Sequence, residues 1–182
     1  MPVYKLDSTH TAAEFSARHM MITTVRGGFK TVNGTLNYDP QNPANSSVEA
    51  VIETNSMSST GLDQRDGHLK SADFLDVANY PTITFKSTKV EPYDNNTRAK
   101  VTGDLTIRDV TRSVVLDVEF LGEAKSPYGH TAIGFTGTTK INREDFGLTW
   151  NMALETGGWL VGKEITINVD AEAILVAEAQ PA

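Results

Sequence analysis

The chain has 182 residues, of which 39% are hydrophobic and 21% charged, so it can bury a core as a single domain. It contains no cysteine, which excludes disulfides, thiolate nucleophiles and zinc sites with cysteine ligands. Its formal net charge of -7 disfavours nucleic acid and anionic lipid surfaces as general partners.

The sequence shows neither the pattern expected of a secretory signal nor that of a membrane-spanning helix. Met1 to Asp7 lacks the basic start and apolar run of a secretory signal. The longest late apolar run, Ala173 to Ala177, has five residues, whereas a membrane-spanning helix needs about 20. We therefore expect a soluble, cytoplasmic protein without a membrane span. Its single domain is expected over residues 1–177, with a frayed tail over residues 178–182.

Alternation of apolar and polar residues recurs along most of the chain and predicts antiparallel strands with one buried face. Clear examples of this pattern are residues 14–19, 47–53, 82–86, 100–108, 114–120 and 165–172. Their apolar faces are Val48, Ala50 and Ile52, then Ile83 and Phe85, then Val101, Gly103, Leu105 and Ile107, then Val114, Leu116, Val118 and Phe120, and finally Ile165, Ile167, Val169 and Ala171.

Turn residues separate these runs. Asp94 to Asn96 and Ser126 to Gly129 predict hairpin turns. Asn33-Gly34 fits either a hairpin turn or a glycine bulge within one long strand, and the pattern does not decide between them. The sequence therefore predicts short connections between antiparallel neighbours.

Helical spacing occurs in two short places. Leu62, Arg65 and Leu69 are spaced as in a helix, with Thr60 as the expected N-cap and a second start near Ser71. Residues 142–147 predict one more turn that ends at a glycine. One or two short helices of this kind would close one end of a barrel.

About eight strands without long helices between them predict an all-β sandwich or barrel. Small residues at expected inward positions favour a single antiparallel eight-stranded barrel with interior space for a ligand. These small residues are Ala17, Ala50, Gly103, Ala132, Gly134 and Ala171.

The conventional candidates for catalysis or metal binding are the four histidines, and their spacing matches no local metal motif. An interior site formed by His19, His68 and His130 is the alternative, enzymatic hypothesis. Arg65 to Leu69 is the densest polar cluster, and it has two interpretations: contacts to a ligand headgroup, or a network that holds the helix in place. No phosphate-binding loop or nucleophile elbow is present, and the sequence indicates no cofactor.

Several ordered blocks resemble the YceI-like, polyisoprenoid-binding family. They are Tyr4 to His10 with Phe15 to His19, Arg65 to Val77, Tyr80 to Thr88, Gly103 to Arg108, and Asn142 to Leu148. The resemblance covers nearly the whole chain and departs at Asp109, where the family usually has glycine.

The resemblance implies a lipocalin-like barrel with a tunnel for a long isoprenoid or isoprenoid quinone. We expect non-catalytic binding or carriage of that lipid. Family members are often dimeric, so a homodimer is an expected partner arrangement. The expected ligand-binding residues are Phe15, Phe29, Ile52, Leu69, Phe74, Phe85, Leu105, Phe146 and Trp150 along the tunnel, with His19, Arg65 and His68 at its polar end.

Overall fold

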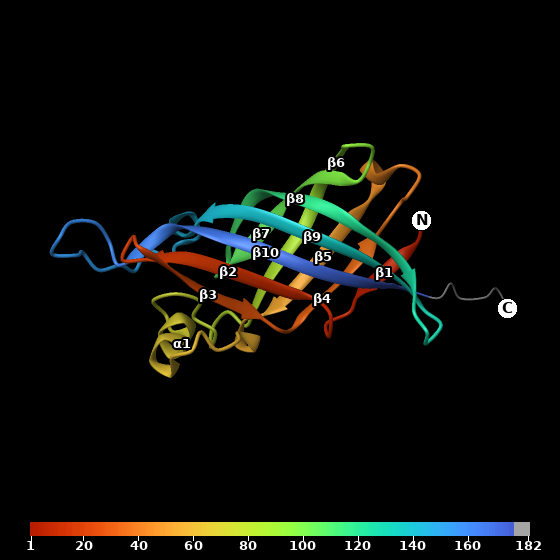
Figure 1. Ribbon diagram of the computed structural model, residues 1–182. Helices are drawn as coiled ribbons and strands as arrows, with labels where there is room; N and C mark the ends of the chain where they lie inside the picture. Colours follow the sequence, from red (N-terminus) through yellow and green to blue (C-terminus); the bar gives the residue numbers. More distant parts are fainter. Residues whose placement is uncertain (177–182) are drawn as a thin grey trace.

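The computed structural model describes residues 1–176 and forms an elongated antiparallel β-barrel (Figure 1). The expected tail over residues 178–182, and residue 177, lie outside the described residues. The elements in chain order are β1 (Val3–Leu6), β2 (Ala12–His19), β3 (Thr23–Phe29), β4 (Val32–Asn37), η1 (Pro43–Asn45), β5 (Ser47–Glu53), η2 (Thr54–Ser56), α1 (Asp63–Lys70), β6 (Thr82–Tyr93), β7 (Arg98–Ile107), β8 (Val110–Lys125), β9 (Thr131–Asn142), η3 (Arg143–Phe146) and β10 (Val161–Leu175).

Ten strand segments fill eight positions of a closed ring. The first part of β10 pairs with β2, and its last residues pair with β1. β1 and β2 therefore share one position of the ring as two collinear segments. β4 pairs with β1 and β3 pairs with β2, so β3 and β4 share the next position in the same way. The predicted eight-stranded antiparallel barrel is thus confirmed.

The tight turns carry positive φ angles where two strands meet. Asp94, Asn95 and Asn96 form the β6–β7 turn with φ between 52° and 64°, as their side chains tolerate well. Asp109 forms the β7–β8 turn together with Arg108, also at positive φ, so aspartate serves where the resemblance leads one to expect glycine.

Gly34 lies inside β4, and the β4–β5 register continues through it without a shift. Asn33-Gly34 is therefore neither a hairpin turn nor a bulge. A Cβ at Gly34 would overlap the carbonyl oxygen of Glu49 on the neighbouring strand. Close approach of the two backbones is the reason for a glycine at this position.

One end of the barrel is covered by α1 and the turns that follow it (Figure 1). Leu62, not Thr60, occupies the N-cap position, so the predicted cap was wrong. The second predicted helix, starting near Ser71, is a series of turns. Within residues 1–176, no helix combines the length and the apolar character needed to cross a membrane.

Most of the buried apolar side chains form two separate clusters. The larger lies at the α1 end and consists of Phe29, Met57, Phe74, Ile83, Leu105, Ile107, Ile141, Phe146 and Leu148. The smaller consists of Tyr4, Ile133 and Ala173, with Tyr38, Phe120 and Phe135 packed against it. A barrel interior that was filled throughout would give one continuous cluster.

A pair of glycine substitutions tests the close packing of β4. Gly34→Ala should lower the free energy of unfolding by roughly 1–3 kcal/mol, because its methyl group meets the backbone of β5. Gly67→Ala in α1 should raise that free energy by about 0.4–1 kcal/mol, because nothing lies near the added methyl and its φ is ordinary. Urea titration of both variants measures these values. Equal effects at the two positions would contradict the assigned contact.

Candidate functional site

The barrel encloses one continuous cavity of about 720 Å³. At one end its lining includes Leu62, Arg65 and Leu160, beside α1 and the long loop before β10. At the other end it includes Asn96 and Arg98, at the β6–β7 turn. The volume falls in the range of roughly 300–1,000 Å³ that is typical of ligand pockets.

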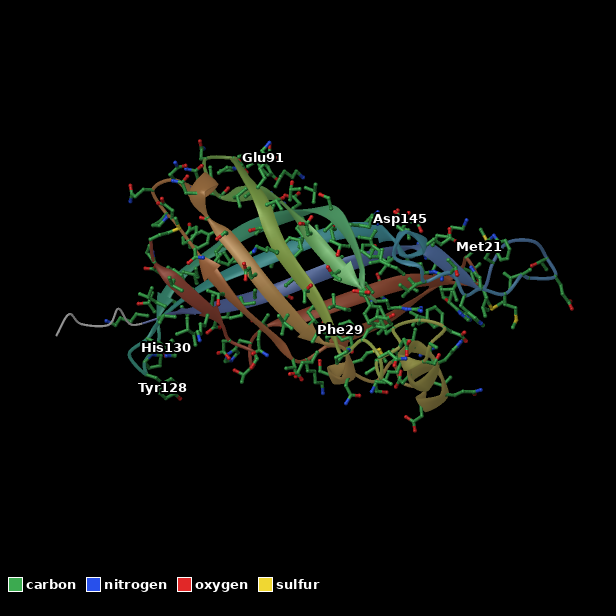
Figure 2. The ribbon with its side chains drawn as sticks, turned by 180° about the vertical axis from the view of Figure 1, so that it is seen from behind. Met21, Phe29, Glu91, Tyr128, His130 and Asp145 are labelled. Atoms are coloured by element: carbon green, nitrogen blue, oxygen red, sulfur yellow. The ribbon has the colours of Figure 1, made fainter. Side chains whose placement is uncertain are left out.

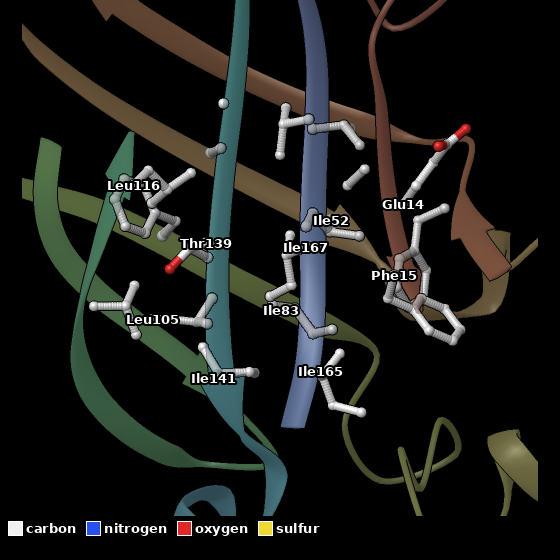
Figure 3. Close-up of a pocket in the computed structure, with 18 of the residues that line it drawn as sticks. Glu14, Phe15, Ile52, Ile83, Leu105, Leu116, Thr139, Ile141, Ile165 and Ile167 are labelled. Atoms are coloured by element: carbon white, nitrogen blue, oxygen red, sulfur yellow. The ribbon is translucent and has the colours of Figure 1, made fainter. Parts of the chain in front are cut away.

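Along the strands, the cavity wall consists mainly of alternate, inward-facing residues. In Figure 3, Ile165 and Ile167 on β10 lie opposite Leu105 on β7 and Leu116 on β8, around the same interior. Every residue of the apolar faces predicted in β5, β6, β8 and β10 belongs to the lining. In β7 the lining includes Val101, Leu105 and Ile107 but not Gly103.

Small residues explain only part of the interior space. Ala17, Ala50 and Ala171 line the cavity as predicted. The ring of Phe85 occupies the space beside Gly103, where a Cβ would overlap it. Ala132 and Gly134 do not belong to the lining, so the prediction that they face the interior and leave space there was wrong.

Three aromatic rings meet at the α1 end of the cavity. The ring centroid of His68 lies 4.4 Å from that of Trp150 and 5.0 Å from that of Phe74, edge to face in both cases. The Nε2 atom of His68 is 2.9 Å from the Asp73 carboxylate. His68 is therefore held by packing on two sides and by a hydrogen bond on a third.

Arg65 and Asp66 both bind Thr60, in the segment just before α1. Arg65 donates from Nε to the Thr60 hydroxyl at 2.7 Å and from Nη2 to the Thr60 carbonyl at 2.6 Å. Thr60 donates to the Asp66 carboxylate through its backbone N–H and its hydroxyl, and these bonds lower the pKa of Asp66. These contacts favour the structural interpretation of the cluster, although Arg65 also lines the cavity.

Arg143 lines the cavity and was missed by the sequence analysis. Its side chain is only 3% exposed. It donates to the carbonyls of Leu148, Trp150, Val161 and Gly162, at 2.7 to 3.3 Å. Burial lowers the pKa of its guanidinium below the ordinary value. One buried charge thus fastens both ends of the loop between η3 and β10 to the barrel.

The far end of the cavity is lined by Tyr38, Phe120, Phe135 and Arg98. Tyr38 stacks on Phe120 with ring centroids 5.8 Å apart, and burial raises the pKa of its phenol. Arg98 is paired with Asp117 at 3.4 Å and with Glu119 at 3.1 Å. The cationic side chain at this end is therefore neutralised by carboxylates.

All the residues predicted to bind a ligand belong to the lining of this one cavity. They are Phe15, His19, Phe29, Ile52, Arg65, His68, Leu69, Phe74, Phe85, Leu105, Phe146 and Trp150. His130 does not belong to the lining. Figure 2 shows it near Tyr128, at the end of the barrel opposite Met21. The alternative site of His19, His68 and His130 is therefore not assembled.

A cluster of titratable groups lies outside the cavity. Ligand atoms of Asp7, His10 and Glu172 lie within 4.8 Å of one another. His10 Nδ1 is 2.9 Å from the Asp7 carboxylate. This hydrogen bond lowers the pKa of Asp7 to about 2 and raises that of His10. The cluster lies between β1 and β2, next to β10, where Asp7 and His10 form a hydrogen-bonded pair.

The model of the YceI-like domain matches residues 4–173. The chain belongs to the YceI-like family. Relatives of this YceI-like chain include a UPF0312 protein of Staphylococcus aureus, 36% identical over 173 residues, which are 94% of this chain and 97% of the relative. A UPF0312 protein of Vibrio cholerae is 38% identical over 147 residues, 80% of this chain and 77% of the relative.

Solved structures share the YceI-like barrel. A Campylobacter jejuni YCEI protein is 34% identical with a TM-score of 0.72, covering 88% of this chain and 90% of that one. BcnA of Burkholderia cenocepacia, 23% identical, reaches 0.77 over 92% of this chain and 98% of its own. A polyisoprenoid binding domain from Saccharophagus degradans, 16% identical, reaches 0.68 over 95% and 98%. The last two likenesses concern the fold alone.

The clamp formed by Arg143 can be tested by removing its donors. Arg143→Met should lower the free energy of unfolding by about 1–3 kcal/mol or more, because even one buried carbonyl left without a donor costs about that much. Arg26→Met changes the same charge on the exposed face of β3 and should shift stability by no more than about 0.5 kcal/mol. Urea titrations measure both. Similar small losses in the two variants would argue against the clamp.

The Asp7–His10 pair makes a prediction for pH. Because the pKa of Asp7 is lowered, its stabilisation is complete above the unfolded value of 3.8 and is lost as the pH falls toward 2. Because the pKa of His10 is raised, its stabilisation is complete below the unfolded value of 6.5 and is lost as the pH rises through the folded value. The pair therefore stabilises the fold most between about pH 3.8 and pH 6.5.

Asp7→Asn should return the pKa of His10 toward 6.5, as measured by NMR titration of the imidazole. Asp39→Asn is a control, since that carboxylate binds the backbone of its own loop. An unchanged His10 titration in Asp7→Asn would show that another group raises this pKa.

Proposed function

We propose that this protein binds a long-chain apolar lipid, of the polyisoprenoid or isoprenoid quinone class, inside the barrel and carries it without catalysis. The single observation that supports this most is the cavity, which runs the length of the barrel and is lined mainly by aliphatic and aromatic side chains. The domain from Saccharophagus degradans, whose barrel is similar, is described as polyisoprenoid binding.

The physical basis is burial of the lipid tail. Each methylene moved from water into an apolar site contributes about 0.8 kcal/mol, so a long tail outweighs any single polar contact. Inward side chains such as Phe85, Ile165 and Ile167 are only partly buried by the protein itself. A bound chain would cover the remaining surface of these residues, which gives the cavity affinity for any tail of matching width.

We assign the polar end of the ligand to the α1 end of the cavity. His19, Arg65 and His68 lie there, beside the buried Arg143. All these groups can donate a hydrogen bond, and Arg65 uses only its Nε and Nη2 atoms in contacts to Thr60. A headgroup that accepts hydrogen bonds, such as a quinone carbonyl, suits this set. The aliphatic tail would extend toward Tyr38.

The assignment of a lipid is tested by native mass spectrometry of the purified protein, followed by organic extraction of whatever is released. A co-purifying isoprenoid or quinone would support the proposal and identify the lipid. A protein that is empty and takes up no added polyprenyl lipid would refute it.

Two neighbouring residues on β5 offer a matched pair of variants for the binding site. Ala50→Phe adds a ring inside the cavity, so the variant should lose a long lipid or accept only a shorter one. Val51→Phe adds the same ring on the opposite, exposed face of β5 and should retain the native lipid. Extracted lipid per folded protein measures both, with circular dichroism as the folding control. Equal retention would place the ligand elsewhere.

A further inference from the structure

Two loops beyond one end of the barrel carry large apolar side chains that face solvent. The β2–β3 turn exposes 63% of Met21 and 73% of Ile22. The loop between η3 and β10 exposes 57% of Met152 and 50% of Trp159. Figure 1 shows this second loop projecting past the ends of the strands. We call Met20, Met21, Ile22, Met152 and Trp159 the apolar tip.

The apolar tip is held together by main-chain contacts. Met20 N–H donates to the Leu160 carbonyl at 2.8 Å, and Leu160 N–H donates to the Met152 carbonyl at 2.9 Å. The sulfur of Met21 lies against Gly158, where a side chain would displace it. Since the two loops are joined in this way, their apolar side chains form one surface rather than two separate flexible segments.

The β2–β3 turn holds its methionines at an energetic cost. Met20 and Met21 have φ angles of 51° and 65°, and Ile22 N–H closes the turn onto the His19 carbonyl at 3.1 Å. Turns with two successive residues at positive φ favour Asn-Gly, because other side chains are strained there. Strained residues that persist at an exposed position indicate a function for their side chains.

We propose that the apolar tip docks the barrel on the surface of an uncharged lipid bilayer. Residues 19–25 and 147–162 contain one carboxylate, Glu155, and no lysine or arginine. The exposed cations Arg18 and Lys163 border these segments, and Lys163 is paired with Glu144 at 3.5 Å. The side chains of the apolar tip itself are uncharged, and Trp and Met side chains bury readily at the boundary of a bilayer. The net charge of -7 further favours neutral over anionic lipid.

The size and the position of the tip favour a bilayer over a second copy of the chain. A stable protein interface buries about 800 Å² on each partner and involves roughly 20–30 residues a side. The tip has only five large exposed side chains, and one of its two loops projects past the ends of the strands (Figure 1). It is also continuous with the cavity, because His19 and Leu160, the chain neighbours of Met20 and Trp159, both belong to the lining. Docking would therefore bring the cavity mouth to the lipid surface.

Flotation with phosphatidylcholine vesicles tests docking directly, whether or not the cavity holds a ligand. The double variant Met21→Ser/Trp159→Ser should bind these vesicles at least about 10-fold more weakly than the native chain, because two buried side chains are lost. The matched control is Leu121→Ser/Tyr128→Ser, which removes one aliphatic and one aromatic side chain exposed by 61% and 91%. Tyr128 lies at the end opposite Met21 (Figure 2), and Leu121 lies on β8 close to the β8–β9 turn. The control should float like the native protein.

Two further measurements define the outcome. Vesicles should shift the tryptophan emission of the native protein to the blue, and Trp159→Phe should still float but lose most of that shift. Binding should not weaken in high salt, because no ion pair supports it. A native chain that fails to float, or a double variant that floats equally well, would overturn the proposal. A dimer abolished by the double variant, without vesicle binding, would overturn it in favour of a second copy.

Discussion

The barrel depends on the pairing of β10 along both of its edges. One edge pairs with β9 over eleven residue positions, from Glu164 to Ile174. The other edge pairs first with β2 and then with β1, which closes the ring. A closed ring fixes the distance between opposite walls, so the inward side chains cannot move together to fill the interior. Closure is thus the reason why a chain of ordinary composition retains a cavity.

The two ends of the barrel are stabilised by different contacts. At the far end, Tyr38 and two phenylalanines pack together, and Arg98 is neutralised by carboxylates. At the α1 end, Arg143 is buried among backbone carbonyls and fixes the long loop before β10. An apolar residue could fill the same volume, but it would leave those carbonyls without donors. The hydrogen bonds of this guanidinium all go to backbone carbonyls, which favours an end that also receives a polar group.

The strands that sequence could predict are those in which one face is continuously apolar. Alternation located β5, β7 and β10 and placed residues such as Ile52, Leu105 and Ile167 on the correct face. Alternation gave little indication of β1. It also did not show that β1 and β2, and likewise β3 and β4, are collinear segments, because this arrangement depends on pairing with β10, more than 130 residues away from β1 and β2. Gly34 could not be interpreted from sequence because its constraint is the backbone of another strand.

The apolar residues of the candidate site could be predicted from sequence, because in a hollow barrel the residues that face the core also form the cavity wall. Phe15 and Phe85 were recognised because inward apolar residues of a hollow barrel necessarily line its cavity. Arg143 was missed because an arginine after a strand usually lies in solvent, and its carbonyl partners come from a loop with no regular pattern. His130 was grouped with the other histidines by residue type alone, and the topology places it at the opposite end.

Departures from local preference are concentrated at one end of the molecule. The α1 end contains the buried guanidinium of Arg143 and the strained turn at Met20 and Met21. The far end has a turn of Asp94 to Asn96, residue types that accept positive φ, and its arginine is fully paired. Sequences generally satisfy local preferences except where function requires otherwise. The asymmetry therefore favours the α1 end, rather than the β6–β7 turn, as the end through which a lipid would enter and leave.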